Sequence, residues 1–154
     1  MRPFAAAALL AVIAQPADAQ HPDHVAVHVG TPLYFEADPH LGGAVSWRKY
    51  FGRGWGLNAE YSFSATGDHS DHVWWVGAAK TLGPLDESVP YIVLGGGGAW
   101  WHTLYGSHRG VRIMPGIGVG LTRWNESRTR FVAPEARFGI NAPLTLSLAF
   151  GFAR

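Results

Sequence analysis

The clearest alternation of large and small side chains lies at the end of the chain. The even positions from 144 to 152 hold only leucine and phenylalanine, and the odd positions between them hold threonine, serine, alanine and glycine. Since successive side chains of a β-strand point to opposite faces, this period of two predicts a strand with one apolar face. We expect this strand to pair with the first strand and close a sheet. Its apolar face is predicted to hold Leu144, Leu146, Leu148, Phe150 and Phe152.

Seven further segments carry the same signal, and no segment after residue 20 keeps a helical period. In two of them the pairs Trp74-Trp75 and Trp100-Trp101 place aromatic side chains on both faces, so the facing of these two strands stays open. Eight strands of about ten residues make the smallest outer-membrane barrel, so we predict an all-β, antiparallel, up-and-down transmembrane β-barrel. The seven segments span residues 24–36, 41–51, 55–65, 72–82, 91–103, 111–123 and 131–140.

The two faces of the predicted strands differ in a way that favours a membrane. A soluble barrel of the lipocalin type points its apolar face inward and its charges outward. Here the less apolar face carries charges and small residues that suit a crowded interior, and an outside built from the other face would aggregate in water. Without a membrane helix, only a closed barrel satisfies its backbone in lipid. The charges on the less apolar face include Arg48, Glu60, Glu135 and Arg137.

Aromatic residues are expected to form two bands on the barrel. If the N-terminus is periplasmic and the strands alternate in direction, one band gathers near each rim, as is typical of transmembrane barrels. The outer band is predicted to hold Tyr34, Phe35, Tyr61, Phe63, Trp74, Trp75, Trp100, Trp101 and Phe138. The periplasmic band is predicted to hold Phe51, Trp55, Tyr91, Trp124, Phe131, Phe150 and Phe152.

The start of the chain has the features of a cleaved secretory signal. Arg2 precedes an apolar stretch too short to cross a membrane, and Ala17-Asp18-Ala19 offers a small-x-small cleavage site. We therefore expect residues 1–19 to be removed and residues 20–154 to form the barrel domain. The absence of cysteine excludes disulfides, thiolate metal sites and a lipoprotein anchor. Cleavage removes one Arg and one Asp, so the net charge stays at +1, which argues against nucleic-acid binding.

A weak internal repeat predicts an ionic network inside the barrel. Residues 57–63 align with residues 132–138, which places Glu60 and Glu135 on opposite walls at similar heights. A buried carboxylate requires a cationic partner. Two interpretations remain: a salt-bridged plug, which the narrow lumen of eight strands favours, or a path for protons or ions. The candidate partners are Arg48, Arg137, Lys80 and Arg112.

Outside the lumen, the sequence gives only weak signals for a metal-binding or catalytic site. The eight histidines include a cluster in one predicted extracellular loop, and Zn²⁺ or Cu²⁺ accepts such ligands. A solvated polar loop is the alternative, and the Asp, His and Ser of this loop also match the residue types of a hydrolytic triad. We expect no catalytic residue, no cofactor and no metal, and we expect the glycines at 95–98 to let tryptophans pack over bare backbone rather than bind phosphate. The metal candidates are Asp68, His69, Asp71 and His72, with a second group at His21, His24 and His28.

Four segments carry a resemblance to a known family. They are Ala17-Asp18-Ala19, residues 51–61, residues 90–98 and the terminal strand. Together they resemble the small outer-membrane β-barrel proteins of Gram-negative bacteria, the OmpA transmembrane-domain and OmpX-like group. Two features depart from it: Ala153 and Arg154 follow the last aromatic residue, and Pro134 sits inside a strand, where we expect a bulge.

The resemblance implies a location and a set of partners. It implies an outer-membrane protein in contact with lipid and lipopolysaccharide, assembled as a monomer with periplasmic chaperones and the barrel-assembly machinery. It also implies a non-enzymatic role in envelope integrity or surface interaction. A lipid A-modifying enzyme or a narrow channel on the same scaffold is the alternative, although the His-x-Ser-Asn arrangement of such enzymes is missing.

Overall fold

A computed structural model describes residues 21–33, 41–66, 69–84, 87–103, 106–139 and 144–153. The predicted signal segment, residues 1–19, lies outside the described residues. In the described part of the chain, no helix is long and apolar enough to cross a membrane. The strands are β1 (His24–Leu33), β2 (Leu41–Gly52), β3 (Trp55–Thr66), β4 (His69–Thr81), β5 (Ser88–Thr103), β6 (Gly106–Trp124), β7 (Arg130–Gly139) and β8 (Leu144–Ala153).

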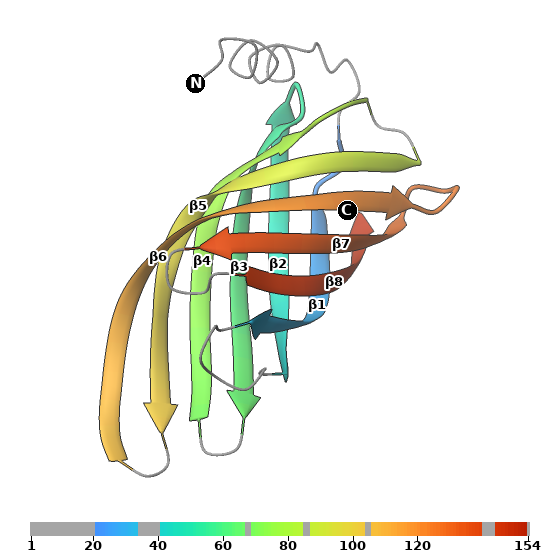
Figure 1. Ribbon diagram of the computed structural model, residues 1–154. Helices are drawn as coiled ribbons and strands as arrows, with labels where there is room; N and C mark the ends of the chain where they lie inside the picture. The colour runs from blue at the N-terminus through green and yellow to red at the C-terminus, as the bar shows by residue number, and fades with distance from the viewer. Residues whose placement is uncertain are drawn as a thin grey trace, which may run out of the picture.

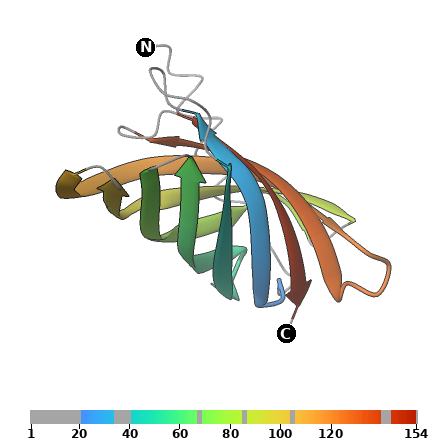
Figure 2. The ribbon, with the colours of Figure 1, turned by 90° about the horizontal axis from the view of Figure 1, so that it is seen from below.

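The eight strands form one closed antiparallel barrel in sequence order (Figure 1). Closure joins β1 to β8, and their register runs without a break from His24↔Ala153 to Leu33↔Leu144. Figure 2 shows these two strands side by side. The predicted barrel and the predicted pairing of first and last strands are both confirmed. We call the end that holds His24 and Ala153 the terminal end, and the end that holds Leu33 and Leu144 the loop end.

The facing of the terminal strand agrees with the alternation in its sequence. Leu148 and Phe150 are 40% and 48% exposed on the outside of the barrel, whereas Ala149 between them is 2% exposed. The same alternation holds in β1 and β2, where valines and Trp47 face outward and Ala26 and Ser46 face inward. The outer surface is therefore apolar along the wall of the barrel, as the two-residue period predicts.

The structure settles the facing of the two strands that the sequence left open. In β4 Trp75 points inward and is 3% exposed, while Trp74 points outward and is 47% exposed. In β5 Tyr91 and Val93 point inward and are buried. The side chains of Trp100 and Trp101 lie outside the described set. Adjacent tryptophans hid the period because an eight-stranded interior has room for an indole ring as well as for small residues.

The predicted periplasmic aromatic band is wrong for three of its members. Tyr91, Trp124 and Phe131 face inward and belong to the buried core, together with Ala79, Val89 and Val93. Two of the three rings lie over glycines of the neighbouring strand, Tyr91 over Gly120 and Phe131 over Gly151. Aromatic residues at strand ends fill the lumen where the wall beside them is bare backbone.

Pro134 causes no bulge. Pairing between β6 and β7 keeps one register on both sides of it, Gly120↔Glu135 before and Arg123↔Val132 after. The ladder is interrupted only at the two intervening positions, because proline has no N–H to donate. Register shifts occur instead at Tyr50/Gly52 and at Trp101/Thr103.

Candidate functional site in the barrel interior

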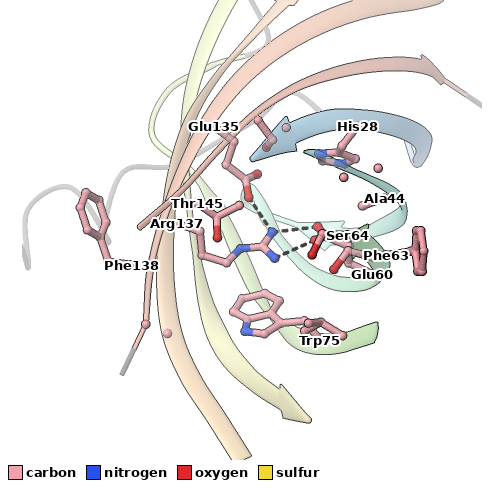
Figure 3. A pocket seen from close by; sticks show the side chains of 18 of the residues that line it. His28, Ala44, Glu60, Phe63, Ser64, Trp75, Glu135, Arg137, Phe138 and Thr145 are labelled. Atoms are coloured by element: carbon pink, nitrogen blue, oxygen red, sulfur yellow. Dashed lines mark hydrogen bonds and ion pairs between the residues drawn. The ribbon is translucent and has the colours of Figure 1, made fainter. Parts of the chain in front are cut away.

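Arg137 is the centre of an ionic network at mid-height in the barrel. Its two terminal nitrogens donate to both carboxylate oxygens of Glu60, at 2.7 and 2.8 Å. The same guanidinium donates to Glu135 Oε1 at 2.6 Å and lies 4.6 Å from the centre of the Trp75 ring. Figure 3 shows Arg137 between the two glutamates, with Trp75 against its guanidinium. A bidentate arginine held on an aromatic ring is a fixed arrangement rather than a mobile charge.

Glu135 joins this centre to a second arginine. Its Oε2 accepts the hydroxyl of Tyr91 at 2.7 Å and lies 3.8 Å from Arg48 Nη2. Arg48 in turn stacks over the Tyr91 ring at 4.2 Å and donates from Nε to Asn58 Oδ1 at 3.0 Å. Glu135 is only 4% exposed, and it contacts groups from β2, β5 and β7 across the lumen.

The network balances its own charge. Arg48 and Arg137 carry two positive charges, and Glu60 and Glu135 carry two negative charges, so the formal sum is zero. Buried ions cost several kcal/mol each unless opposite charges and hydrogen bonds compensate them. Here four charged groups from β2, β3 and β7 compensate one another, which ties opposite walls of the barrel together. The arrangement matches the salt-bridged plug of the two interpretations.

A cavity of about 90 Å³ adjoins the network on the side of the loop end. This cavity has room for several water molecules. Small side chains line most of the wall, among them Ala44, Ser62 and Ser147. His28 lies at the edge and its Nε2 is hydrogen bonded to Ser46 Oγ at 2.7 Å.

One of the predicted network partners, Lys80, lies outside the network. Lys80 donates from Nζ to the backbone carbonyl of Arg53 and lies 5.4 Å from the centre of the Trp55 ring. Lys80 is 2% exposed at the terminal end and contacts the turn at Arg53 instead of the network, so its expected place in the network is wrong. The side chain of Arg112 lies outside the described set. Arg48, Glu60, Glu135 and Arg137 are brought together.

Two of the four residues of the predicted loop site have described side chains. Asp68 and the side chain of His69 lie outside the described residues. Asp71 faces the interior and is 9% exposed, whereas His72 faces outward, where Tyr61 Oη and His72 Nδ1 are hydrogen bonded at 2.7 Å. Neighbouring residues of one strand point to opposite faces, so Asp71 and His72 do not share a ligand set or a triad. Among the described residues, no group of three or more His, Cys, Asp or Glu side chains is placed to hold a metal.

Tyr91 and Asn58 complete the network and were not predicted as part of it. Asn58 lies on the inward face that the sequence identified for β3, so its participation was accessible from parity alone. Tyr91 could not be assigned to the inward face in this way, because the tryptophans of its strand obscured which face points inward. A polar residue on the inward face at the height of a buried charge is the signal that finds such partners.

Solved structures with a similar fold were found, although sequence comparison found no relative. No protein-family model and no curated protein matches the sequence. Neisserial surface protein A superposes with a TM-score of 0.63 at 10% identity, covering 84% of this chain and 92% of that one. The N-terminal β-barrel domain of Pseudomonas aeruginosa OprF gives 0.61 at 18% identity, covering 86% and 98%. This chain has the fold of the small eight-stranded outer-membrane barrels.

Other barrels of this fold differ in what they do. The attachment invasion locus protein Ail of Yersinia pestis matches with a TM-score of 0.59 at 16% identity, covering 85% of this chain and 95% of that one. The outer membrane enzyme PagL matches with 0.52 at 17% identity, covering 85% and 99%. An attachment protein and an enzyme thus share the small outer-membrane barrel, so the role must be argued from the residues.

Proposed function

We propose that this protein is a non-enzymatic integral outer-membrane barrel that supports envelope integrity or surface interaction, exported with its N-terminal signal peptide. The observation that best supports this proposal is the contrast between the outer and the inner face of the barrel wall. The outside is apolar along the wall, whereas mid-height of the lumen holds four mutually compensated charges. Lipid is the solvent that suits such an outside. Because ion pairs join opposite walls across the lumen, a structural role is supported better than a transport path.

The proposal includes an orientation and partners. The terminal end, where His24 of β1 pairs with Ala153 of β8, faces the periplasm, in line with the periplasmic N-terminus assumed from the sequence. The turn between β2 and β3 at this end is tight, and Gly52, Arg53 and Gly54 all have positive φ there. The outward faces contact outer-membrane lipid and lipopolysaccharide. During biogenesis the unfolded chain is carried by periplasmic chaperones to the barrel-assembly machinery and inserts as a monomer.

Cell fractionation tests the location. The protein expressed with its native leader should be recovered in the outer membrane, start near Gln20, and migrate faster on gels without boiling than after boiling. A barrel resists detergent until heated because every backbone group is paired within it. A soluble periplasmic monomer would overturn the proposal.

Two assays on a deletion strain separate the roles. Loss of a structural barrel should raise sensitivity to detergents and leave the lipid A mass spectrum unchanged, and the purified protein should not conduct in planar bilayers at neutral pH. A changed lipid A spectrum, restored by the intact gene, would establish the enzyme instead. Stable single-channel steps that disappear on changing Glu60 or Arg137 would establish the channel.

A further inference from the structure

Three residues before β1, together with its first residue, are packed into the terminal end of the barrel. We call His21, Pro22, Asp23 and His24 the latch. His21 Nε2 is hydrogen bonded to Thr81 Oγ1 of β4 at 3.0 Å, and the backbone N–H of Tyr50 in β2 donates to Asp23 Oδ1 at 2.8 Å. His21 and His24 are each 4% exposed. The residues before the first strand of a domain are ordinarily poorly ordered unless specific contacts hold them in place. The contacts of the latch therefore suggest that this segment has a role of its own.

The two imidazoles bridge opposite walls of the lumen. The ring of His24 lies 4.6 Å from Phe131 of β7 and 6.1 Å from Trp124 of β6. On the other wall, Tyr50 of β2 lies 5.3 Å from the His21 ring and 5.9 Å from the His24 ring. The latch therefore fills the lumen at its terminal end by aromatic contact with strands on both sides.

The charged side chains of other strands that act on the two imidazoles are cationic. Lys80 of β4 acts on His21, and Arg48 of β2 acts on His24, while His28 lies farther along β1. The Asp23 carboxylate accepts a hydrogen bond from the backbone N–H of Tyr50. Protonation of either histidine would thus place a new positive charge in an apolar pocket beside a positive charge that is already there.

The energetic sign follows from burial. Burial lowers the pKa of His21 below its ordinary value of 6.5; a hydrogen bond to the Gly83 backbone opposes this shift, and Lys80 adds to it. A base whose pKa is lowered in the folded state stabilises that state above the unfolded pKa and loses this contribution as the pH falls. The packed form of the latch is therefore the form with neutral imidazoles.

We propose that the latch is an acid-releasable closure of the terminal end: His21 and His24 seal the lumen while neutral and leave it when protonated. This goes beyond the proposed envelope role and does not depend on it, because it concerns one barrel end whatever the protein does in the cell. In the released form, Ala26, inward on β1 directly behind the latch and 2% exposed, becomes accessible to water.

The absence of cysteine makes a direct test available. Ala26→Cys places one thiol behind the latch, and Glu126→Cys places one in the exposed turn between β6 and β7 as a reference for the pH dependence of thiol chemistry. Both are labelled in lipid vesicles with a charged, water-soluble maleimide. Between about pH 7.5 and about pH 5.5, which spans the ordinary histidine pKa, the ratio of the two rates should rise about tenfold or more.

Two histidine variants test whether the latch histidines cause the change of the labelling ratio with pH. In His21→Gln with His24→Phe, the amide still reaches Thr81 and the phenyl ring keeps the aromatic contacts, so the barrel end should stay closed and the ratio should not change with pH. His28→Gln, a buried histidine on the same strand outside the latch, should keep the full acid response. If the double variant fails to migrate as a folded barrel, His21→Gln alone should at least halve the response.

Either of two results would overturn the proposal. A ratio in the unchanged latch that is the same at both pH values shows that no opening occurs. A response that His28→Gln removes, that survives in the folded double variant, or that stays undiminished in folded His21→Gln alone, places the titrating group elsewhere.

Discussion

At the residue scale, Glu135 determines how strongly the interior holds together. Its side chain is 1% exposed and it contacts Arg137, Tyr91 and Arg48. Glu135→Leu leaves cationic groups buried without their counter-charge, so we expect the free energy of unfolding to fall by about 3–5 kcal/mol. Urea titration of the refolded barrel in lipid vesicles measures it.

An exposed ion pair of the same chain is the matched control. Glu87 and Arg123 lie 3.2 Å apart with side chains 69% and 71% exposed. Solvent screening makes such a pair worth only about 0–1 kcal/mol, so Glu87→Leu should change stability little. Equal losses at Glu87 and Glu135 would mean that the network is hydrated rather than buried.

A second residue-scale prediction concerns Gly120. A methyl group added there would meet the Tyr91 ring, whose hydroxyl donates to Glu135, so Gly120→Ala should displace Tyr91 from the network. Overpacking of this kind costs about 1–3 kcal/mol. Gly83, around which the structure leaves open space, supplies the control, since Gly83→Ala meets nothing within 4 Å. The same urea titration compares them, and no difference would contradict the close packing at Gly120.

Four of the six predicted network residues could be found from the sequence. At those positions, the alternation along the strand places a charged side chain on the face that points into the barrel. Lys80 fails for a physical reason: a long side chain near a strand end bends toward a turn carbonyl, as it does to Arg53, and parity does not describe it. Tyr91 was missed because the adjacent tryptophans at 100 and 101 concealed which face of its strand points inward. Contacts across the lumen depend on shear, which no single strand encodes.

At the element scale, β8 tests which solvent surrounds the barrel. Leu148 faces outward at the middle of the strand, opposite Val29 of β1 and Pro134 of β7. Near the bilayer midplane Leu148→Arg should cost about 2–4 kcal/mol, whereas Leu144→Arg at the loop-end rim should cost about 0–1. Unfolding free energies in vesicles give both values. Similar costs at the two positions would argue against a depth-dependent lipid environment.

The same strand is needed for closure. Removing residues 150–154 deletes the pairs that join the start of β1 to β8, among them Val27↔Phe150 and Val25↔Phe152. An open edge in lipid leaves backbone groups unsatisfied at several kcal/mol each, so the shortened chain should not reach the heat-modifiable form. Gel mobility without boiling shows this, and a folded band for the shortened chain would contradict it.

Element-scale prediction from sequence succeeded where one face was uniform. The regular alternation of β8, β1 and β2 was sufficient to identify their outward faces. In β4 and β5 the adjacent tryptophans conceal the period, because Trp74 lies on the outer wall and Trp75 supports Arg137 inside. A bulge was expected at Pro134, but the missing donor interrupts the ladder without changing the register.

At the scale of the whole molecule, one barrel combines two different interiors. The cavity lies toward the loop end and the compensated charges lie at mid-height, whereas the terminal end holds aromatic rings and buried histidines. The outside is apolar over both halves. The number and order of strands could be predicted from the chain, since eight alternating segments with an apolar exterior have few solutions in lipid.

The central claim is that the alternating apolar face contacts lipid, and a cysteine scan of β8 tests it most directly. Single cysteines at positions 144–153 of the refolded protein in vesicles carry nitroxide labels, and oxygen and a water-soluble nickel chelate report lipid and water contact. The account predicts oxygen-accessible, nickel-protected labels at the even positions from 146 to 150 and oxygen-protected labels at the odd positions between them. Nickel access at even positions equal to that in the exposed turn at Glu126 would show an outside in water and contradict the account.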